Sequence, residues 1–85
     1  MKKEIQELIK TMQKVKGEDA IISIFHKLYG EQKLKCVLNP IADERVGFNV
    51  KDHDIYIEKD KINKIRLGDD IYFADDIMEI IIKIE

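Results

Sequence analysis

The stretch IYFADDIMEIIIKI, residues 71–84, decides the fold of this 85-residue chain. Apolar residues recur at every second position on both sides of the dipeptide Asp75-Asp76. Because successive side chains of a strand point to opposite faces, this period of two predicts two strands joined by a tight turn. The side chains expected to face a common core are Ile71, Phe73, Met78, Ile80, Ile82 and Ile84.

The same period of two extends towards the N-terminus as far as Lys33. It predicts further strands over residues 33–38, 46–50, 55–58 and 62–67. Short turn signals separate these segments: Asn39-Pro40, Asp52-His53-Asp54 and Gly68-Asp69. Proline has no N–H to donate to a neighbouring strand, so we expect Asn39-Pro40 to end the strand before it. Connections this short favour antiparallel pairing of consecutive strands.

The segment from Ala20 to Tyr29 fits two descriptions. As a helix, its apolar side chains fall within one arc, and Asp19 and Gly30 would mark its ends. As a strand, it is rich in the β-branched and aromatic residues that strands favour, and the strand over 33–38 would be its hairpin partner. We expect a strand, with a helix as the alternative. One face of that strand would carry Ile22, Ile24 and Leu28, and the other Ile21, Phe25 and Tyr29.

Residues 2–16 predict an amphipathic helix. Apolar side chains recur along one stripe at helical spacing, with lysines and glutamines outside it. Gly17 follows at the position where a helix commonly ends. The stripe consists of Ile5, Leu8, Ile9, Met12 and Val15.

Together these elements predict an α+β fold, in which an N-terminal amphipathic helix packs on a small, bent, mainly antiparallel sheet or partial barrel of five to six strands. A chain of this length has room for one small core, so we expect residues 1–85 to form a single domain. In element order only, one helix followed by short strands resembles the small barrels of Sm-like and SH3-like domains. A likeness at this level does not by itself carry a function.

Charge is distributed unevenly along the chain. The sequence has 15 basic and 17 acidic residues, a net charge of −2. Residues 1–38 hold eight lysines and five acids, whereas residues 39–85 hold seven basic residues and twelve acids. The acidic excess peaks in residues 69–79, which contain no basic residue. We expect these acids to form a recognition surface for a basic groove on a partner protein: Asp69, Asp70, Asp75, Asp76 and Glu79.

These carboxylates do not predict a metal site. Asp69-Asp70 and Asp75-Asp76 lie in turns at the two ends of the strand expected over 71–74, about 13 Å apart. Their spacing also differs from that of a calcium-binding EF-hand loop.

A second candidate surface is apolar. One helix cannot cover both faces of a sheet in so short a chain, so we expect some apolar side chains to meet a second copy or another protein. We also expect the last strand, 77–84, to be a sheet edge open to strand addition. The candidate interface residues are Tyr56, Tyr72, Ile77 and Ile81, on an apolar face that Val37, Ile21 and Phe25 would extend.

The helix lysines suggest an alternative function. In a small barrel, Lys3, Lys10 and Lys14 could contact RNA phosphates. No aromatic residue lies between these lysines to stack on bases, and a sequence pI near 5.7 is low for a nucleic-acid-binding domain.

The residues usual in catalysis are few: His26, Cys36 and His53. Cys36 falls between Leu34 and Leu38 on the face expected to be buried, and the three residues match no zinc-ligand spacing. We therefore expect no catalytic activity, no cofactor and no metal.

The longest uncharged apolar run is far shorter than the ~20 residues of a membrane span, and no apolar core of a signal peptide follows the N-terminal lysines. With a single cysteine, we expect a cytoplasmic protein. The sequence favours a non-catalytic protein–protein interaction module, such as a bacterial or phage accessory or inhibitor protein that presents acidic turns and an apolar sheet face. The abundance of Ile and Lys, typical of AT-rich coding, favours such a source.

Overall fold

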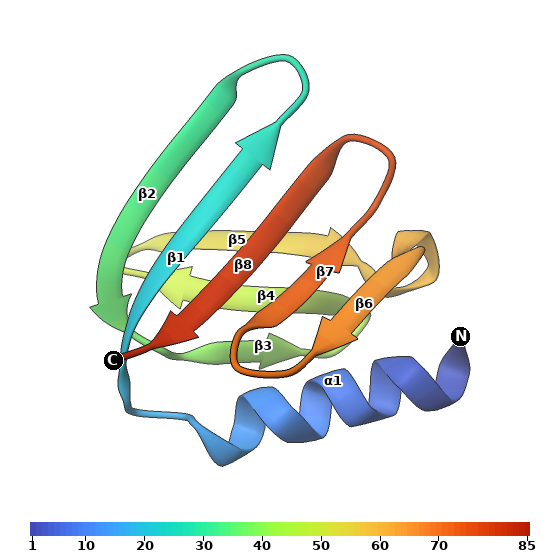
Figure 1. The fold of residues 1–85 in the computed structure, drawn as a ribbon, viewed down its shortest axis with the longest axis horizontal. Coiled ribbons are helices and arrows are strands. Elements are labelled where there is room, and N and C mark those ends of the chain that lie inside the picture. The colour runs from blue at the N-terminus through green and yellow to red at the C-terminus, as the bar shows by residue number, and fades with distance from the viewer.

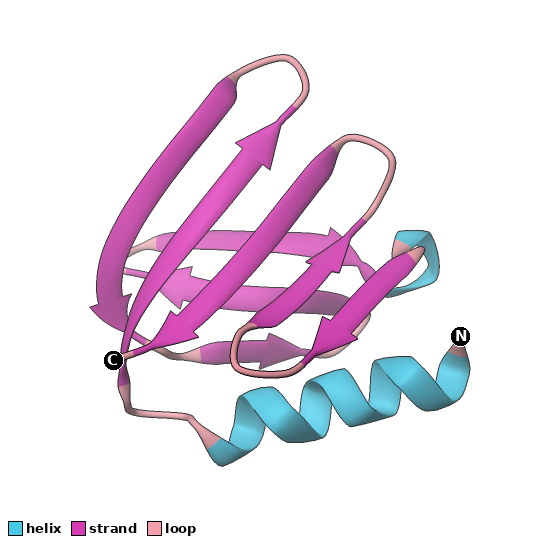
Figure 2. Ribbon diagram, viewed as in Figure 1, coloured by secondary structure: helices cyan, strands magenta, loops and turns pink.

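The structure is a computed structural model that describes residues 1–85. It has one N-terminal helix, eight strands and a single 3-10 turn, η1 (Lys59–Lys61), as Figure 2 shows. The helix is α1 (Lys2–Lys14). The strands are β1 (Asp19–His26), β2 (Gly30–Val37), β3 (Pro40–Ala42), β4 (Arg45–Val50), β5 (His53–Glu58), β6 (Lys64–Leu67), β7 (Ile71–Ala74) and β8 (Met78–Ile84).

The predicted helix is confirmed, and it ends at Lys14, two residues earlier than expected. Its inward face buries Ile5, Leu8 and Met12. Gly17 then adopts a left-handed conformation with φ of 87°, and its N–H donates to the carbonyl of Leu38. This bond turns the chain into β1, and glycine accepts that conformation without the steric cost of a Cβ atom.

The eight strands form two antiparallel sheets that face each other (Figure 1). The larger sheet has the order β2-β1-β8-β7-β6 and the smaller one the order β3-β4-β5. Helix α1 lies along one side of both sheets, where it packs on β3, β6 and β7. The α+β class with an N-terminal helix on antiparallel strands is therefore confirmed. The strands number eight instead of five or six, and the two sheets are not closed into a barrel.

The core lies between the two sheets and the helix. Its largest fully buried side chains include Phe48 from the smaller sheet, Phe73 from the larger sheet and Leu8 from α1. Burying a side chain of this size contributes roughly 1.5–3 kcal/mol. Of the inward residues predicted by alternation, Phe48, Ile57, Ile71, Phe73, Ile80 and Ile82 are buried. Met78 and Ile84 of β8 are half-buried against the same core.

Residues 19–26 form a strand, so the expectation of a strand in the 20–29 segment is confirmed, and the alternative helix is not. Ala20, Ile22 and Ile24 face the core. The prediction that Leu28 shares their face is wrong, because the strand ends at His26. There the His26 Nδ1 atom accepts hydrogen bonds from the N–H groups of Leu28 and Tyr29, at 3.1 and 3.3 Å.

The position predicted for the last strand is also wrong. β8 lies in the middle of the larger sheet, between β1 and β7, and is not an edge. Ile82 pairs with Ile22 on one side and with Ile71 on the other. A strand bonded on both sides needs few charged residues to deter other chains, which accounts for the run Ile80-Ile81-Ile82.

The strand β3 corresponds to none of the predicted segments. Pro40 begins β3 instead of ending strand structure, and it pairs with Phe48 of β4. β3 is an edge of the smaller sheet, where a residue without an N–H is tolerated. No helix in this structure has both the length and the apolar composition needed to cross a bilayer.

Candidate functional site

The five predicted acidic residues do not form one surface. Asp69 and Asp70 lie in the turn from β6 to β7, at the opposite end of β7 from Asp75 and Asp76. Glu79 lies on β8, directly across from Ala74. The structure therefore brings Asp75, Asp76 and Glu79 together and leaves Asp69 and Asp70 apart from them.

The turn from β7 to β8 is held by its own aspartates. The Asp75 Oδ1 atom accepts hydrogen bonds from the N–H groups of Ile77 and Met78, at 2.8 and 2.7 Å. The Asp76 Oδ1 atom accepts one from the Asn63 side-chain amide at 2.6 Å. Aspartate side chains commonly stabilise turns in this way. Asp75 therefore shapes the loop that presents Ile77.

Three of the four predicted apolar residues lie near this turn, on the face of the larger sheet that points away from the core. Tyr72 and Ile81 are cross-strand neighbours on β7 and β8, and both are half-buried. Ile77 in the turn is 50% exposed. Phe25 of β1, expected on the same apolar face but not among the four candidate interface residues, is 36% exposed and pairs with Glu79. We call Phe25, Tyr72, Ile77 and Ile81 the outer-sheet patch.

A hollow of ≈ 320 Å³ lies at one end of the outer-sheet patch. Phe25 and Ile77 supply apolar surface to it, and His26 and Met78 complete its uncharged part. Its charged lining consists of Lys27, Lys64, Asp75, Asp76 and Glu79. Three carboxylates against two ammonium groups leave this hollow with an excess of negative charge.

Tyr72 and Glu79 are hydrogen-bonded to each other on the same face of the larger sheet. The Tyr72 hydroxyl donates to Glu79 Oε2 at 3.1 Å, and the Arg66 guanidinium lies 4.8 Å from the centre of the Tyr72 ring. Burial raises the pKa of Tyr72, and the hydrogen bond to Glu79 raises it further. The phenol therefore stays neutral and fixes the Glu79 carboxylate beside Phe25.

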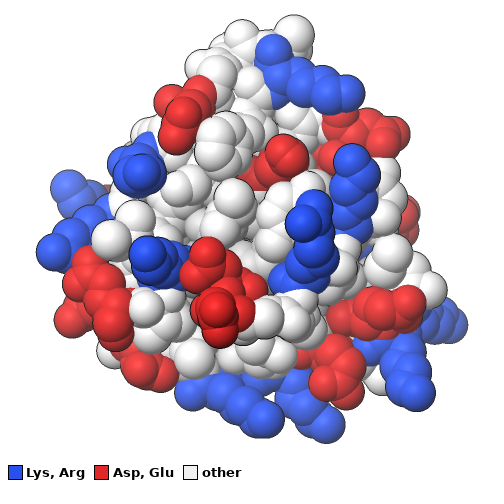
Figure 3. Space-filling view, viewed as in Figure 1, with Lys and Arg blue, Asp and Glu red and all other residues white.

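Figure 3 shows this face of the molecule. Uncharged atoms fill much of its centre, and single lysine, arginine and acidic side chains stand between them. Charged side chains of both signs therefore lie among the uncharged ones on this face and do not form a rim around it.

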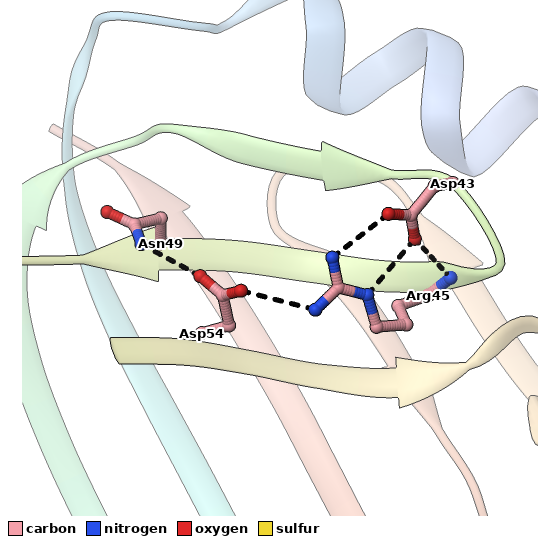
Figure 4. Close-up of polar contacts among 4 residues, drawn as sticks. All are labelled: Asp43, Arg45, Asn49 and Asp54. Carbon is pink, nitrogen blue, oxygen red and sulfur yellow. Dashed lines mark hydrogen bonds and ion pairs between the residues drawn. The ribbon is translucent and has the colours of Figure 1, made fainter. Parts of the chain in front are cut away.

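Tyr56, the fourth predicted apolar residue, lies on the other sheet and is not part of this patch. It belongs to β5 and pairs with Gly47 of β4. The Arg45 guanidinium covers its ring at 5.1 Å. Arg45 is held there by two carboxylates (Figure 4): Nη2 and Nε donate to Asp43 at 2.9 and 3.2 Å, and Nη1 donates to Asp54 at 3.2 Å.

The Arg45 cluster shifts the pKa values of its members. Hydrogen bonds from Arg45 lower the pKa of Asp43 to about 2. The pKa of Asp54 is lowered chiefly by a 2.8 Å hydrogen bond from the Asn49 amide, and the same contacts with Asp43 raise the pKa of Arg45. All of these charges already have partners within the chain.

The predicted RNA-binding lysines share one exposed stripe of α1. Lys3, Lys10 and Lys14 fall within a narrow arc at 100° per residue, and all three are exposed. Glu7 lies in the same arc and interrupts the stripe with a negative charge. No aromatic side chain belongs to this stripe.

The other candidate reactive residues lie on three different strands, β1, β2 and β5. Cys36 is half-buried on the inner side of β2, and burial raises the pKa of its thiol. Its thiolate form is therefore disfavoured at neutral pH. His26 organises the turn from β1 to β2, and His53 is exposed at the start of β5. No three His, Cys, Asp or Glu side chains gather in a geometry that could hold a metal ion.

Comparison with known proteins gives no match: no family model, no curated protein and no solved structure is significantly similar to this chain.

Proposed function

We propose that this protein is a non-catalytic, cytoplasmic protein interaction module that docks a partner protein on the outer-sheet patch. The observation that carries the proposal is the exposure of Ile77 and Phe25 beside the half-buried pair Tyr72 and Ile81. Each lies on a regular strand or on a turn fixed by Asp75, so the surface is organised before a partner arrives.

The charges at the hollow favour one kind of partner. Asp75, Asp76 and Glu79 exceed the nearby lysines, so a basic side chain on the partner would be attracted there. The expected partner segment carries an apolar side chain for the space beside Phe25 and Ile77, with a lysine or arginine next to it. A bacterial or phage accessory protein that occupies a basic surface of its target fits this description.

The test uses the partner recovered on the wild-type protein from a lysate of the native host and then purified. We expect Ile77→Lys to weaken its binding by at least about tenfold, because a lysine places a charge in the apolar centre of the interface. Tyr56→Ser is the matched control, since Tyr56 lies on the opposite sheet, and it should leave the affinity unchanged. Equal affinities for wild type and Ile77→Lys would refute the proposal.

A further inference from the structure

β2 is an edge strand of 8 residues whose second side bonds to no other strand. The Leu38 N–H donates to Glu18, and its carbonyl accepts from Gly17, so the backbone groups of Leu38 point towards the start of β1. In an antiparallel strand, alternate residues direct their N–H and C=O groups to the same side. The groups that point away from β1 therefore belong to Glu31, Lys33, Lys35 and Val37.

The hydrogen bonds between β1 and β8 support this assignment. The Glu85 N–H donates to the carbonyl of Asp19, and the Lys27 N–H donates to the carbonyl of Ile77. Odd-numbered residues of β1 thus bond to β8 and even-numbered ones to β2, where Ile22 lies opposite Leu34. The free edge of β2 is consequently a row of unpaired donors and acceptors, the template for an added strand.

An apolar groove runs beside this edge. Five strands face only three, so β2 packs mainly on β1 and lies beyond the smaller sheet (Figure 1). A hollow of ≈ 580 Å³ lies between Leu34 on β2 and Val50 and Ile55 on the β4–β5 hairpin. A second hollow of ≈ 660 Å³, lined by Cys36 and Leu38, shares Val50 with the first. The two together follow the inner side of β2.

The charges around the groove are mainly positive. The lysines that line it are Lys16, Lys35 and Lys51, and Lys33 stands on the strand edge itself. Lys35 forms an exposed ion pair with Glu85 at 3.5 Å, whereas the other three lysines form no ion pair within the chain. The one carboxylate in the lining, Asp54, already accepts hydrogen bonds from Arg45 and Asn49. Lysines on an edge discourage neutral apolar strands, whereas an acidic strand would neutralise them.

The geometry points to strand addition at this edge: β2 binds an extended, acidic segment of a partner protein, whose apolar side chains enter the groove and whose carboxylates meet Lys33 and Lys35. Main-chain hydrogen bonds supply the affinity, and alternate side chains supply the specificity. A second copy of this chain is a poorer occupant, because its own β2 would bring Lys33 and Lys35 to an edge that is already rich in lysine.

The proposed segment binds the free edge and the inner side of β2, whereas the outer-sheet patch lies on the outer face of β1, β7 and β8. Only Phe25 of the patch borders β2, where it lies opposite Glu31. The two proposals can therefore fail separately. Ile77→Lys should leave binding at the β2 edge unchanged.

The experiment uses the full chain and a synthetic peptide of the length of β2, 8 residues, that alternates glutamate and valine. We expect binding that weakens as salt rises and that slows hydrogen exchange of the amides of Glu31, Lys33, Lys35 and Val37. The same peptide methylated on alternate backbone nitrogens should bind about tenfold or more weakly, because it cannot bond to the edge. A peptide that alternates lysine and valine should not bind.

The double variant Lys33→Glu with Lys35→Glu separates charge from folding. It keeps the backbone, and its circular dichroism should match that of the wild type. The variant should no longer bind the glutamate peptide, and it should bind the lysine peptide. The inference is overturned if the glutamate peptide fails to bind, if it binds without protecting those four amides, or if they become protected in the protein alone as its concentration rises, which would place a second copy at the edge.

Discussion

The two sheets of this protein present different outer faces. On the smaller sheet, Arg45 covers Tyr56 and is bonded to Asp43 and Asp54, so its charged groups are satisfied within the chain. On the larger sheet, Ile77 is 50% exposed and has no such cover, while the exposed fraction of Phe25, 36%, is close to the 39% of Tyr56. Arg66 covers Tyr72 there, but no comparable cation lies over Phe25. A partner gains little from groups that are already bonded, so exposed apolar surface is the better sign of a docking face.

The largest expected effect is in the smaller sheet, at Gly47. A Cβ atom on this residue would lie 2.6 Å from the Tyr56 Cα atom and closer still to the Ile55 carbonyl oxygen. Backbone has to move to admit it, so Gly47→Ala should lower the free energy of unfolding by about 3 kcal/mol. The added Cβ atom of Gly68→Ala, in the turn from β6 to β7, meets no atom within 4 Å and should change the free energy of unfolding by less than about 1 kcal/mol. Urea titration of both variants measures the difference, and equal stabilities would contradict the close packing at Gly47.

The next largest effect on stability is expected at Asp75, in the turn from β7 to β8 of the larger sheet, whose carboxylate is hydrogen-bonded within the chain. Asp75→Ala removes the acceptor for the N–H groups of Ile77 and Met78 and should cost about 1 kcal/mol of stability. Asp69→Ala is the matched control in the turn at the other end of β7, where no side-chain hydrogen bond forms, and should cost less than about 0.5 kcal/mol. Thermal unfolding checks both variants. A larger loss of stability for Asp69→Ala than for Asp75→Ala would contradict the assignment of Asp75 as the aspartate that stabilises its turn.

A smaller effect should depend on pH. Because Arg45 lowers the pKa of Asp43 to about 2, the ionised carboxylate favours the folded state above the unfolded pKa of about 4. That contribution is lost as the pH falls from about 4 to about 2. Asp43→Asn should therefore be less stable than wild type at pH 6 and similar to it near pH 2. A stability difference that stays constant over this range would show that Asp43 does not titrate as described.

The smallest effect is expected on α1. Lys10→Ala with Lys14→Ala should leave the weak binding of a single-stranded RNA oligonucleotide unchanged, because Glu7 interrupts the lysine stripe and no aromatic side chain joins it. Fluorescence anisotropy at several salt concentrations measures this. Tight binding that falls steeply with salt and weakens in the double variant would instead support RNA binding as the function.

Local patterns in the sequence were sufficient to predict the helix and those strands whose positions depend only on neighbouring residues. The period of two identified β4, β5, β7 and β8, and helical spacing identified α1, because both report which side chains face the core. The prediction that Pro40 ends strand structure was wrong, because a proline that would break a central strand is accepted in an edge strand such as β3.

Pairing between distant segments could not be read from the sequence. Nothing local shows that β8 pairs with β1, so the last strand was wrongly predicted as an edge. For the same reason Tyr56 was grouped with Tyr72 although they lie on different sheets. Asp69 and Asp75 have similar neighbours in sequence, and only the fold shows which one bonds to its turn. Phe25 was placed on the apolar face but left out of the candidate interface residues, because its exposure depends on which strands flank β1.

The most direct test of the outer-sheet patch is photo-cross-linking in the native host. A photo-reactive amino acid replaces Ile77 in one variant and Tyr56 in another. We expect an adduct of one defined mass from position 77, none from position 56, and loss of the adduct when Ile81→Lys is added. Adducts of equal yield from both positions, or from position 56 alone, would contradict the assignment of the larger sheet as the docking face.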